Sequence, residues 1–388
     1  MKKAGGILLA LCMLLSLAAC RTDGGPGVPQ DTTAPTQAYK NTMTGEELMK
    51  EMKIGWNLGN TLDAPEGELS WGMPMTTREM IEKVHALGFD TIRIPISWHK
   101  HVGPAPEYTI DEAWLKRVET VVGYALELDM YVIINSHHDN SVYFPTPENA
   151  QSAKTYLQAI WTQIATRFRD AEHRLIFQTM NEPRIEGSSY EWNIDLKNPD
   201  CVAALEVINQ LNQTAVDAIR ATGGANAERW IIVSAYAGSP QSSIASQFRL
   251  PEDPARKLIV SVHAYTPYNL CLNVNSPEST FTDSMAGDFT GFMKSLHYKF
   301  VSKGTPVIID EMGCINKNNP DDRYAWAKAY VSAAQQYGMV CCWWDNGVVK
   351  GSGELFGILN RRKLEVHADS QSVLQGLMDG LQANENKE

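Results

Sequence analysis

Short apolar runs alternate with longer amphipathic segments along most of the chain. Eight runs have the length and composition of strands, and they cover residues 54–59, 91–97, 131–137, 174–180, 230–236, 258–265, 306–311 and 339–344. Segments with helical spacing separate them, several beginning at a Ser, Thr or Asp and ending near a Gly. Only the segment at residues 238–257 is weakly helical. This order predicts repeated strand–helix units.

The apolar runs predict parallel strands that are buried on both faces. Residues 132–134 and 307–309 both read "VII", without polar alternation. Eight such units predict a closed (β/α)8 TIM barrel of the α/β class, in a single domain. The alternative is an open, doubly wound sheet, but "GWNLGN" after the first run lacks the spacing of a phosphate-binding turn.

The first forty residues follow a different pattern. Lys2 and Lys3 precede an apolar stretch, residues 7–19, that has the length of a secretory signal and is too short to span a membrane. It ends in "LAAC", which resembles the bacterial lipobox and predicts lipid attachment to Cys20 after cleavage; a plain secretory signal is the alternative. We therefore expect a signal peptide at 1–19, a Gly- and Pro-rich tether at 20–40 and the barrel at 41–388.

Composition and charge narrow the possible partners. The chain has 388 residues, 44% of them hydrophobic, which is enough for a large core. Its formal charge of -11 would repel phosphate backbones, so nucleic acid is not expected as a partner. We expect an extracytoplasmic monomer at the bacterial cell envelope, on the outer membrane or cell surface, whose contact with the membrane is the lipid anchor alone.

The cysteines after the lipobox are unevenly spaced and do not predict a disulfide framework. Cys341 and Cys342 would face opposite sides of one strand. We expect buried, mostly unpaired thiols, with one disulfide left open, among Cys201, Cys271, Cys314, Cys341 and Cys342.

Polar and aromatic residues gather where the predicted strands end. In a barrel of parallel strands the active site lies at the C-terminal ends of the strands, so these residues are candidates for function. They are Arg93, His137, His138, Asn181, Glu182, His263, Tyr265, Glu311 and Trp344.

Two carboxylates stand out in this set. Glu182 and Glu311 follow the fourth and seventh runs, and a closed barrel would bring them to one mouth. One protonated and one ionised carboxylate can cleave a glycosidic bond. Arg93 within a buried run needs an anion, and Glu311 is the candidate. The alternative is that each Glu forms a structural ion pair with a basic residue.

Two other features admit alternatives. "SHHDN" at residues 136–140 suggests a metal site. Adjacent His side chains would diverge on a strand, however, so no metal is expected. Several tryptophans lie near predicted loops and could stack on sugars; we assign that role to Trp344 alone, among Trp56, Trp71, Trp98, Trp343 and Trp344.

Seven ordered motifs give the chain a family resemblance. They are "GWNLGNTLDA", "IRIPISW", "VIINSHHD", "MNEP", "SVHAYTPYNL", "VIIDEMG" and "CWWDNG". With them the chain resembles glycoside hydrolase family 5, the cellulase family, and is most similar to its bacterial endo-β-1,4-glucanase subfamily, subfamily 4. The resemblance implies a (β/α)8 barrel and retaining, endo-acting hydrolysis of β-1,4-linked glucan without a cofactor.

The resemblance also implies residue roles. Glu182 matches the acid/base and Glu311 the nucleophile. The supporting residues would be Arg93, His137, Asn181, His263 and Tyr265, and the substrate-binding residues Asn60, His138 and Trp344. The family commonly has Gly before its nucleophile and an aromatic residue after it, whereas Asp310 and Met312 stand here. We expect Asp310 to face the helices and to find a basic partner there.

The choice of substrate stays open within the family. Related members cleave xyloglucan, mixed-linkage glucan, mannan or xylan. Two alternatives belong to other classes: a non-catalytic surface lipoprotein that binds glycans, and a metal hydrolase built on His137, His138 and Asp139.

Overall fold

The computed structural model describes residues 41–383. The predicted signal peptide, Cys20 and the tether lie outside the described residues, so these predictions stay untested. Among the described helices, none has the length and apolar character needed to cross a membrane.

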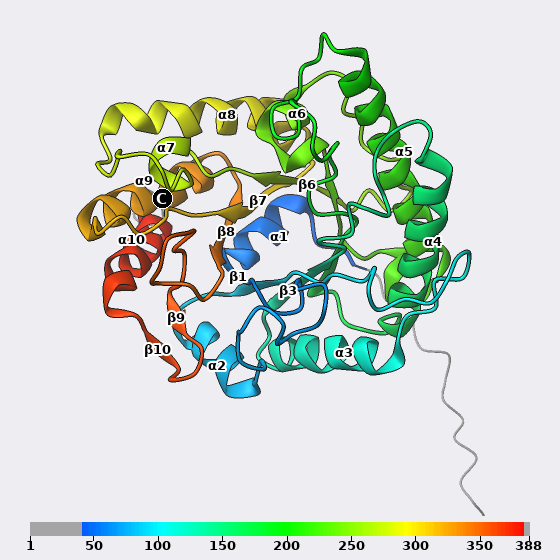
Figure 1. The fold of residues 1–388 in the computed structure, drawn as a ribbon, viewed down its shortest axis with the longest axis horizontal. Helices are drawn as coiled ribbons and strands as arrows, with labels where there is room; N and C mark the ends of the chain where they lie inside the picture. Colours follow the sequence, from blue (N-terminus) through cyan, green and yellow to red (C-terminus); the bar gives the residue numbers. More distant parts are fainter. Residues whose placement is uncertain (1–40, 384–388) are drawn as a thin grey trace, which may run out of the picture. The chain divides into compact units, whose positions relative to one another are not determined.

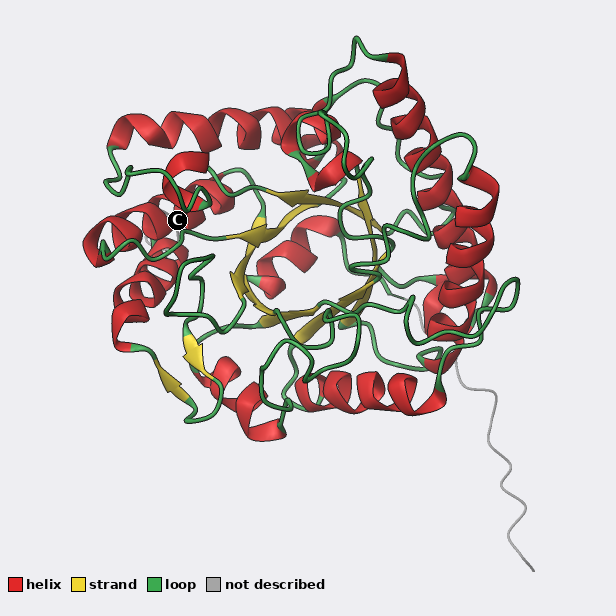
Figure 2. Ribbon diagram, viewed as in Figure 1, coloured by secondary structure: helices red, strands yellow, loops and turns green. Residues whose placement is uncertain are grey.

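Eight parallel strands form a closed barrel (Figures 1 and 2). β1 pairs with both β2 and β8, which excludes the open sheet. Every predicted run overlaps one strand, and β7 and β8 each end one residue beyond their runs. The strands are β1 (Ile54–Leu58), β2 (Thr91–Ile94), β3 (Tyr131–Asn135), β4 (Leu175–Gln178), β5 (Ile231–Ser234), β6 (Leu258–His263), β7 (Val307–Met312) and β8 (Val340–Asp345).

Helices surround the barrel (Figure 1). They are α2 (Arg78–Ala86), α3 (Glu112–Leu126), α4 (Ala150–Arg167), α5 (Pro199–Ala221), α6 (Pro240–Ile244), α7 (Tyr268–Cys271), α8 (Ala286–Lys299), α9 (Pro320–Gln336) and α10 (Gln371–Gln382). The segment predicted to be weakly helical contains only the five-residue α6. After β8 the chain forms a short hairpin, β9 (Leu359–Asn360) and β10 (Glu365–Val366), before α10.

The strands separate two apolar cores. Their outward side chains pack against the helices, whereas inward side chains such as Ile133, Ile232 and Ile308 form a second cluster inside the barrel. α1 (Gly45–Met52) closes the N-terminal end of the barrel, where its Leu48 and Met52 join the inner cluster. Figure 2 shows this helix within the ring of strands.

The cysteines in the described region are buried and free, as expected. Cys341 belongs to the outer core and Cys342 to the inner one, which confirms that the two side chains face opposite sides of β8. Their separation follows from the two-residue period of a strand.

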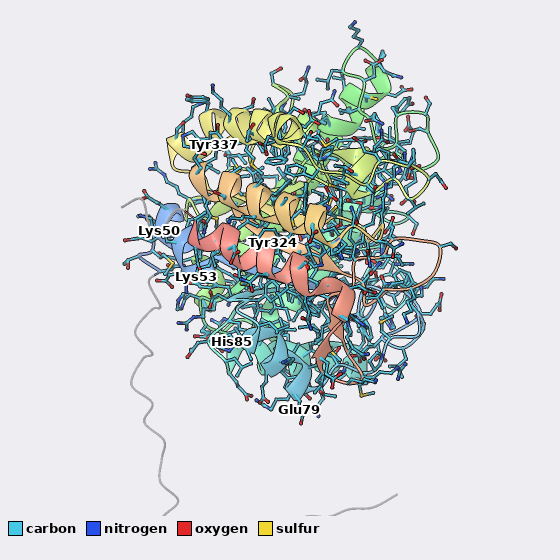
Figure 3. All side chains as sticks on the ribbon, turned by 90° about the vertical axis from the view of Figure 1, so that its left-hand side faces the viewer. Lys50, Lys53, Glu79, His85, Tyr324 and Tyr337 are labelled. Atoms are coloured by element: carbon cyan, nitrogen blue, oxygen red, sulfur yellow. The ribbon has the colours of Figure 1, made fainter. Side chains whose placement is uncertain are left out.

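α9 and α10 lie side by side in close contact (Figure 3). The hydroxyl of Tyr324 on α9 donates a hydrogen bond of 2.6 Å to Asp379 on α10. Gly376 and Gly380 of α10 allow the approach: a Cβ at Gly376 would lie 2.5 Å from the carbonyl oxygen of Tyr324, and one at Gly380 would lie 2.8 Å from that of Lys328.

Candidate active site

Glu311, on β7, is a carboxylate held by two donors at the C-terminal mouth of the barrel. Its Oε1 accepts a hydrogen bond of 2.6 Å from Arg93 Nη1, and its Oε2 accepts one of 3.1 Å from the hydroxyl of Tyr265. The contact with Arg93 was predicted from the sequence, and the structure shows it. The two donors fix the plane of the carboxylate and favour its ionised form.

The prediction that Asp310 faces the helices is wrong. Its Oδ2 accepts from Gln178 and its Oδ1 from Ser261, each at 2.7 Å, inside the barrel. It does have a basic partner there, since Oδ2 lies 3.5 Å from Arg93 Nε.

An irregularity in β7 explains the error. The pairing register shifts between Ile309 and Met312 toward β8, and again opposite Ser261 and His263 of β6. A bulge of this kind interrupts the alternation of a strand, so two successive residues, Asp310 and Glu311, both face inward.

Arg93 is the centre of the buried network. It is fully buried, and besides Glu311 its guanidinium donates to the side-chain oxygens of Gln178, Asn57 and Asn181 at 2.6–2.9 Å. A fixed guanidinium with acceptors on several strands holds those strands' side chains in one arrangement.

Glu182 follows β4 and approaches Glu311 across the mouth. Its Oε1 lies 2.7 Å from His263 Nδ1 and its Oε2 lies 3.6 Å from Arg184 Nη1. Glu182, His263 and Glu311 each offer one atom, and these three atoms all lie within 4.8 Å of one another. The carboxylates are therefore close enough for one to attack a carbon while the other protonates the oxygen leaving it.

The chain leaves the strand pattern before it reaches Asn181. β4 ends at Gln178, and the N–H of Asn181 donates to the carbonyl of Ser136 while the carbonyl of Pro183 accepts from Ala237. Released from strand alternation, Asn181 turns its Oδ1 to Arg93 while Glu182 reaches His263. Both adjacent side chains thus serve one site.

The carboxylates around His263 favour its protonated form. Burial raises the pKa of Glu311, although the charges of His263 and Arg93 favour its ionised form. Burial also opposes ionisation of Glu182, but the hydrogen bond and charge of His263 hold the pKa of Glu182 below its usual value. Burial disfavours charged His263 too, yet the charges of Glu311 and Asp310 raise its pKa. Together these shifts favour a protonated His263 beside an ionised Glu182.

His137 and Trp344 pack against each other beside the carboxylates. Their rings are stacked, with centroids 5.8 Å apart and planes 3° apart. Burial, with the nearby charges of His138 and Arg93, lowers the pKa of His137 well below its usual value, so this ring is neutral. Trp344 is 8% exposed, and it belongs to the same buried core cluster as Trp56, Trp98 and Trp343.

The two adjacent histidines do not diverge, contrary to the prediction. β3 ends at Asn135, so His137 and His138 lie beyond the strand, with ring centroids 4.4 Å apart. Their nitrogen atoms and a carboxylate oxygen of Asp63 lie within 4.8 Å of one another. Asp139, the predicted third member of a metal site, instead accepts hydrogen bonds from Trp98 N and Ser136 Oγ.

Asp63 is also committed to its own loop. It accepts hydrogen bonds from the N–H groups of Asn60 and Thr61, at 2.9 and 2.6 Å. Half-buried Asn60 lies in this turn after β1, with a positive φ of 58°. The turn thus brings Asn60 to the same end of the barrel as the carboxylates.

Comparison with known proteins places this geometry in a family. The family model described as cellulase (glycosyl hydrolase family 5) matches residues 51–349. The chain belongs to glycoside hydrolase family 5.

Relatives in family 5 cover most of the chain. It is 45% identical over 336 residues to the cellulase/esterase CelE of Acetivibrio thermocellus, covering 86% of this chain but only 40% of that protein. It is 43% identical over 324 residues to endoglucanase A of Ruminococcus albus, covering 81% of this chain and 87% of that one.

Solved family 5 structures agree in fold. A lichenase mutant from Caldicellulosiruptor sp. F32, in complex with cellotetraose, superimposes with a TM-score of 0.84 and 41% identity, covering 91% of this chain and 99% of that one. A GH5-4 broad specificity endoglucanase from Ruminococcus champanellensis with bound cellotriose gives 0.83 and 44%, covering 88% and 100%. The predicted family and barrel are confirmed.

Sequence reasoning missed several residues of this family 5 site. Arg184 lies beside Glu182, and Trp192 lies on Arg184 in the loop after β4. Trp71, which was set aside, is 44% exposed, and its ring lies 5.6 Å from that of His138. A tryptophan in a Gly- and Ser-rich loop after a barrel strand was the available signal.

Proposed function

We propose that the chain is a retaining, endo-acting β-1,4-glucanase with Glu311 as nucleophile and Glu182 as acid/base. The observation that carries the proposal is the close approach of these two carboxylates, with one oxygen of each within 4.8 Å of the other. Retaining glycosidases hold their carboxyl groups about 5–5.5 Å apart, whereas inverting ones leave space for a water molecule.

In the first step, Glu311 attacks the anomeric carbon and the glycosidic bond breaks. Arg93 and Tyr265 hold the attacking carboxylate, and Glu182 gives a proton to the departing oxygen. In the second step, Glu182 takes a proton from water, and the resulting nucleophile releases the sugar from Glu311. Asn181, held by Arg93, would bind the 2-hydroxyl of the sugar.

The proton for the first step would come from His263. Its Nδ1 lies 2.7 Å from Glu182 Oε1, so the proton can move without a rearrangement of side chains. A bound sugar excludes water from Glu182 and favours the neutral form of this carboxylate. Transfer from His263 to Glu182 would therefore accompany substrate binding.

The relatives support a β-glucan as substrate. Those named above include a cellulase, an endoglucanase and a lichenase, and two solved structures hold cellotetraose or cellotriose. We propose a β-1,4-glucan chain as the substrate, with xyloglucan, mixed-linkage glucan, mannan and xylan as competing polymers to be measured beside it.

Two other classes of protein, a glycan-binding lipoprotein and a metal hydrolase, would behave differently. A glycan-binding lipoprotein without catalysis would not need the donors that hold Glu311, so the complete network favours an enzyme. A metal hydrolase would lose activity in EDTA. Because Asp139 and Asp63 are both engaged by neighbouring N–H groups, we expect EDTA to leave activity unchanged.

The test is hydrolysis of soluble polymers by the wild type, Glu182→Gln and Glu311→Gln, with EDTA present. We expect wild-type activity on carboxymethylcellulose and mixed-linkage β-glucan, with an early fall in viscosity from endo cleavage. Each substitution should reduce kcat by about 10²-fold or more, because each removes a group that acts in the transition state. Glycan binding without wild-type hydrolysis would mean a binding protein.

We also propose that the protein is a lipid-anchored monomer outside the cytoplasm. The support is in the sequence, where "LAAC" ends a short apolar stretch and a Gly- and Pro-rich segment follows Cys20.

A further inference from the structure

A hollow of about 180 Å³ lies beside the mouth of the barrel, where the loop after β1 meets the β9–β10 hairpin. It is lined by residues 72–74 together with Gly347, Asn360, Arg361, Arg362 and His367. Arg361 fixes its place in the fold, because its guanidinium donates to the carbonyls of Gly59, just after β1, and of Asp345, at the end of β8. The hollow therefore lies at the end of the strands that carries the catalytic carboxylates.

Arg362 brings a positive charge to this hollow, although the chain as a whole has a formal charge of -11. Its side chain is exposed and donates one hydrogen bond, of 3.1 Å, to the carbonyl of Gly72. Arg361 has Asp345 as its ion-pair partner, whereas Arg362 has none within residues 41–383. A guanidinium with its remaining N–H groups at a hollow is suited to bind a carboxylate.

Arg361 adds a buried donor that lacks an acceptor. It is 5% exposed, and its Nε has no hydrogen-bond partner among the described residues. Nε faces two residues that line the hollow, since a Cβ at Gly347 would lie 3.3 Å from Nε and 2.5 Å from the sulfur of Met73. A buried N–H without an acceptor is unfavourable, and the flexible side chain of Met73 could turn aside to admit an oxygen atom.

His367 is a neutral member of the lining. Burial lowers the pKa of its ring, although the charges of Asp345 and Asp369 act in the opposite direction. A neutral imidazole can donate one hydrogen bond but carries no charge. The charge that is available to a ligand in this hollow is therefore that of Arg362.

We propose that this hollow binds a carboxylate carried by the glycan, such as that of a uronic acid or a carboxymethyl substituent. Arg362 would hold the carboxylate by charge-assisted hydrogen bonds, with Arg361 Nε as the donor behind it. This inference rests on the proposed function and adds to it a preference for glycans with acidic substituents.

The position of the hollow selects the part of the glycan that would carry the carboxylate. Glu182 follows β4, and in a closed ring of eight strands β4 lies across the barrel from β8. Because Glu182 protonates the departing oxygen, the leaving part of the glycan extends toward β4. The hollow beside β1 and β8 would therefore bind a substituent on the part that stays attached to Glu311.

The test compares two soluble β-1,4-glucans that differ in charge. Carboxymethylcellulose carries carboxylates, whereas hydroxyethylcellulose is neutral. At low and constant ionic strength, we expect Arg362→Gln to lower kcat/KM for carboxymethylcellulose by about threefold or more, and to change kcat/KM for hydroxyethylcellulose less than about 1.5-fold. High salt should reduce the loss, because it screens the charges.

Arg256→Gln is the matched control. Arg256 is exposed and precedes β6, at the opposite end of the barrel, so its replacement changes the net charge equally but away from the hollow. It should change kcat/KM for neither polymer. Equal losses on carboxymethylcellulose in the two variants would show an effect of net charge alone and refute the site. Equal losses of Arg362→Gln on both polymers, or none on carboxymethylcellulose, would refute it as well.

Calorimetric titration with sulfate distinguishes a carboxylate of the glycan from a free inorganic anion. A free anion would use the same donors, so sulfate would bind the wild type and not Arg362→Gln. If this occurs while both proteins have the same kinetics on carboxymethylcellulose, the hollow binds free anions and the assignment to the glycan is overturned.

Failure of the proposed function would look different. A wild type inactive on both polymers would contradict the enzyme assignment, not the site. Electrophoresis in native gels that contain one polymer, compared with gels that contain none, then decides. Weaker retardation of Arg362→Gln than of the wild type by carboxymethylcellulose alone supports the site, and equal retardation overturns it.

Discussion

Arg93 shows how one buried charge can organise a site. Its fully buried guanidinium is balanced by Glu311 at 2.6 Å and by Asp310 at 3.5 Å, so charges of both signs share the interior of the barrel. The burial of such a pair costs desolvation energy that its mutual attraction only partly offsets. The benefit is geometric, because the network fixes the direction of Glu311.

Replacement of Arg93 should therefore damage stability and activity together. Arg93→Met leaves Asp310 and Glu311 buried without a cation, which should lower the free energy of unfolding by about 3–5 kcal/mol. Urea denaturation followed by fluorescence measures this change. Arg78→Met removes an exposed ion pair with Glu127 and should leave stability nearly unchanged. Similar losses in the two variants would contradict this account of Arg93.

Glu354 is a third carboxylate near the pair. Its carboxylate has no hydrogen-bond or ion-pair partner within residues 41–383, and its carbonyl accepts from Asn346 just after β8. Desolvation raises the pKa of Glu354, and the negative charges of Glu311 and Glu182 add to the rise. This repulsion is mutual, so ionised Glu354 also raises the pKa values of the two catalytic carboxylates.

Removal of the negative charge of Glu354 should shift the pH dependence of activity. Glu354→Gln removes a negative charge, which lowers the pKa values of Glu311 and Glu182, so both limbs of the profile of kcat/KM against pH should move to lower pH. Glu252→Gln, which removes an exposed carboxylate in the segment between β5 and β6, is the control and should not move it. A shift of either limb to higher pH would show that the charge of Glu354 does not act on the pair.

At the scale of elements, glycine sets the spacing of α9 and α10. Gly376→Ala would place a Cβ 2.5 Å from a backbone oxygen of α9, and overpacking of this kind should lower the free energy of unfolding by about 1–3 kcal/mol. Gly291→Ala on α8 meets no atom within 4 Å and should raise it by about 0.5–1 kcal/mol, because alanine favours the helix. Thermal denaturation of both variants measures these opposite changes in stability. If both variants were stabilised, or both destabilised, this account of the glycines would be wrong.

The sequence predicted the strands well wherever a single repeat of apolar positions continues along the whole segment. All eight predicted runs correspond to strands, because burial on both faces keeps the runs largely apolar, and only β7 and β8 extend one residue beyond their runs. Strand alternation failed at Asp310, where a bulge turns two neighbours inward, and at His137 and His138, which lie past the end of β3. Such local departures depend on pairing with neighbouring strands, which a single segment does not reveal.

The candidate site was predictable to the extent that barrel topology places strand ends together. Glu182, Glu311, Arg93 and Tyr265 came from that rule and from the family resemblance, and the structure brings them into contact. Arg184 and Trp192 were missed because loop conformation decides whether a side chain lies in the mouth or away from it.

At the scale of the whole molecule, the lipid anchor should govern location and not catalysis. Cys20→Ser removes the thiol to which lipid would be attached, so we expect the full chain to move from the membrane fraction to the soluble one. Its kcat on soluble β-glucan should stay the same, because the described site uses no residue before position 41. Membrane association that survives the substitution would contradict lipid attachment at Cys20.

The position of α1 also decides at which end the chain enters the barrel. Just before α1, the carbonyl of Met43 accepts a hydrogen bond from Lys257, the residue that precedes β6, so the chain enters the barrel at its closed end. The described part of the chain thus begins at the end of the barrel opposite the catalytic mouth. The segment that leads into β1 therefore does not cover the mouth, so a long polysaccharide could cross the mouth without meeting this segment and be cut in the middle.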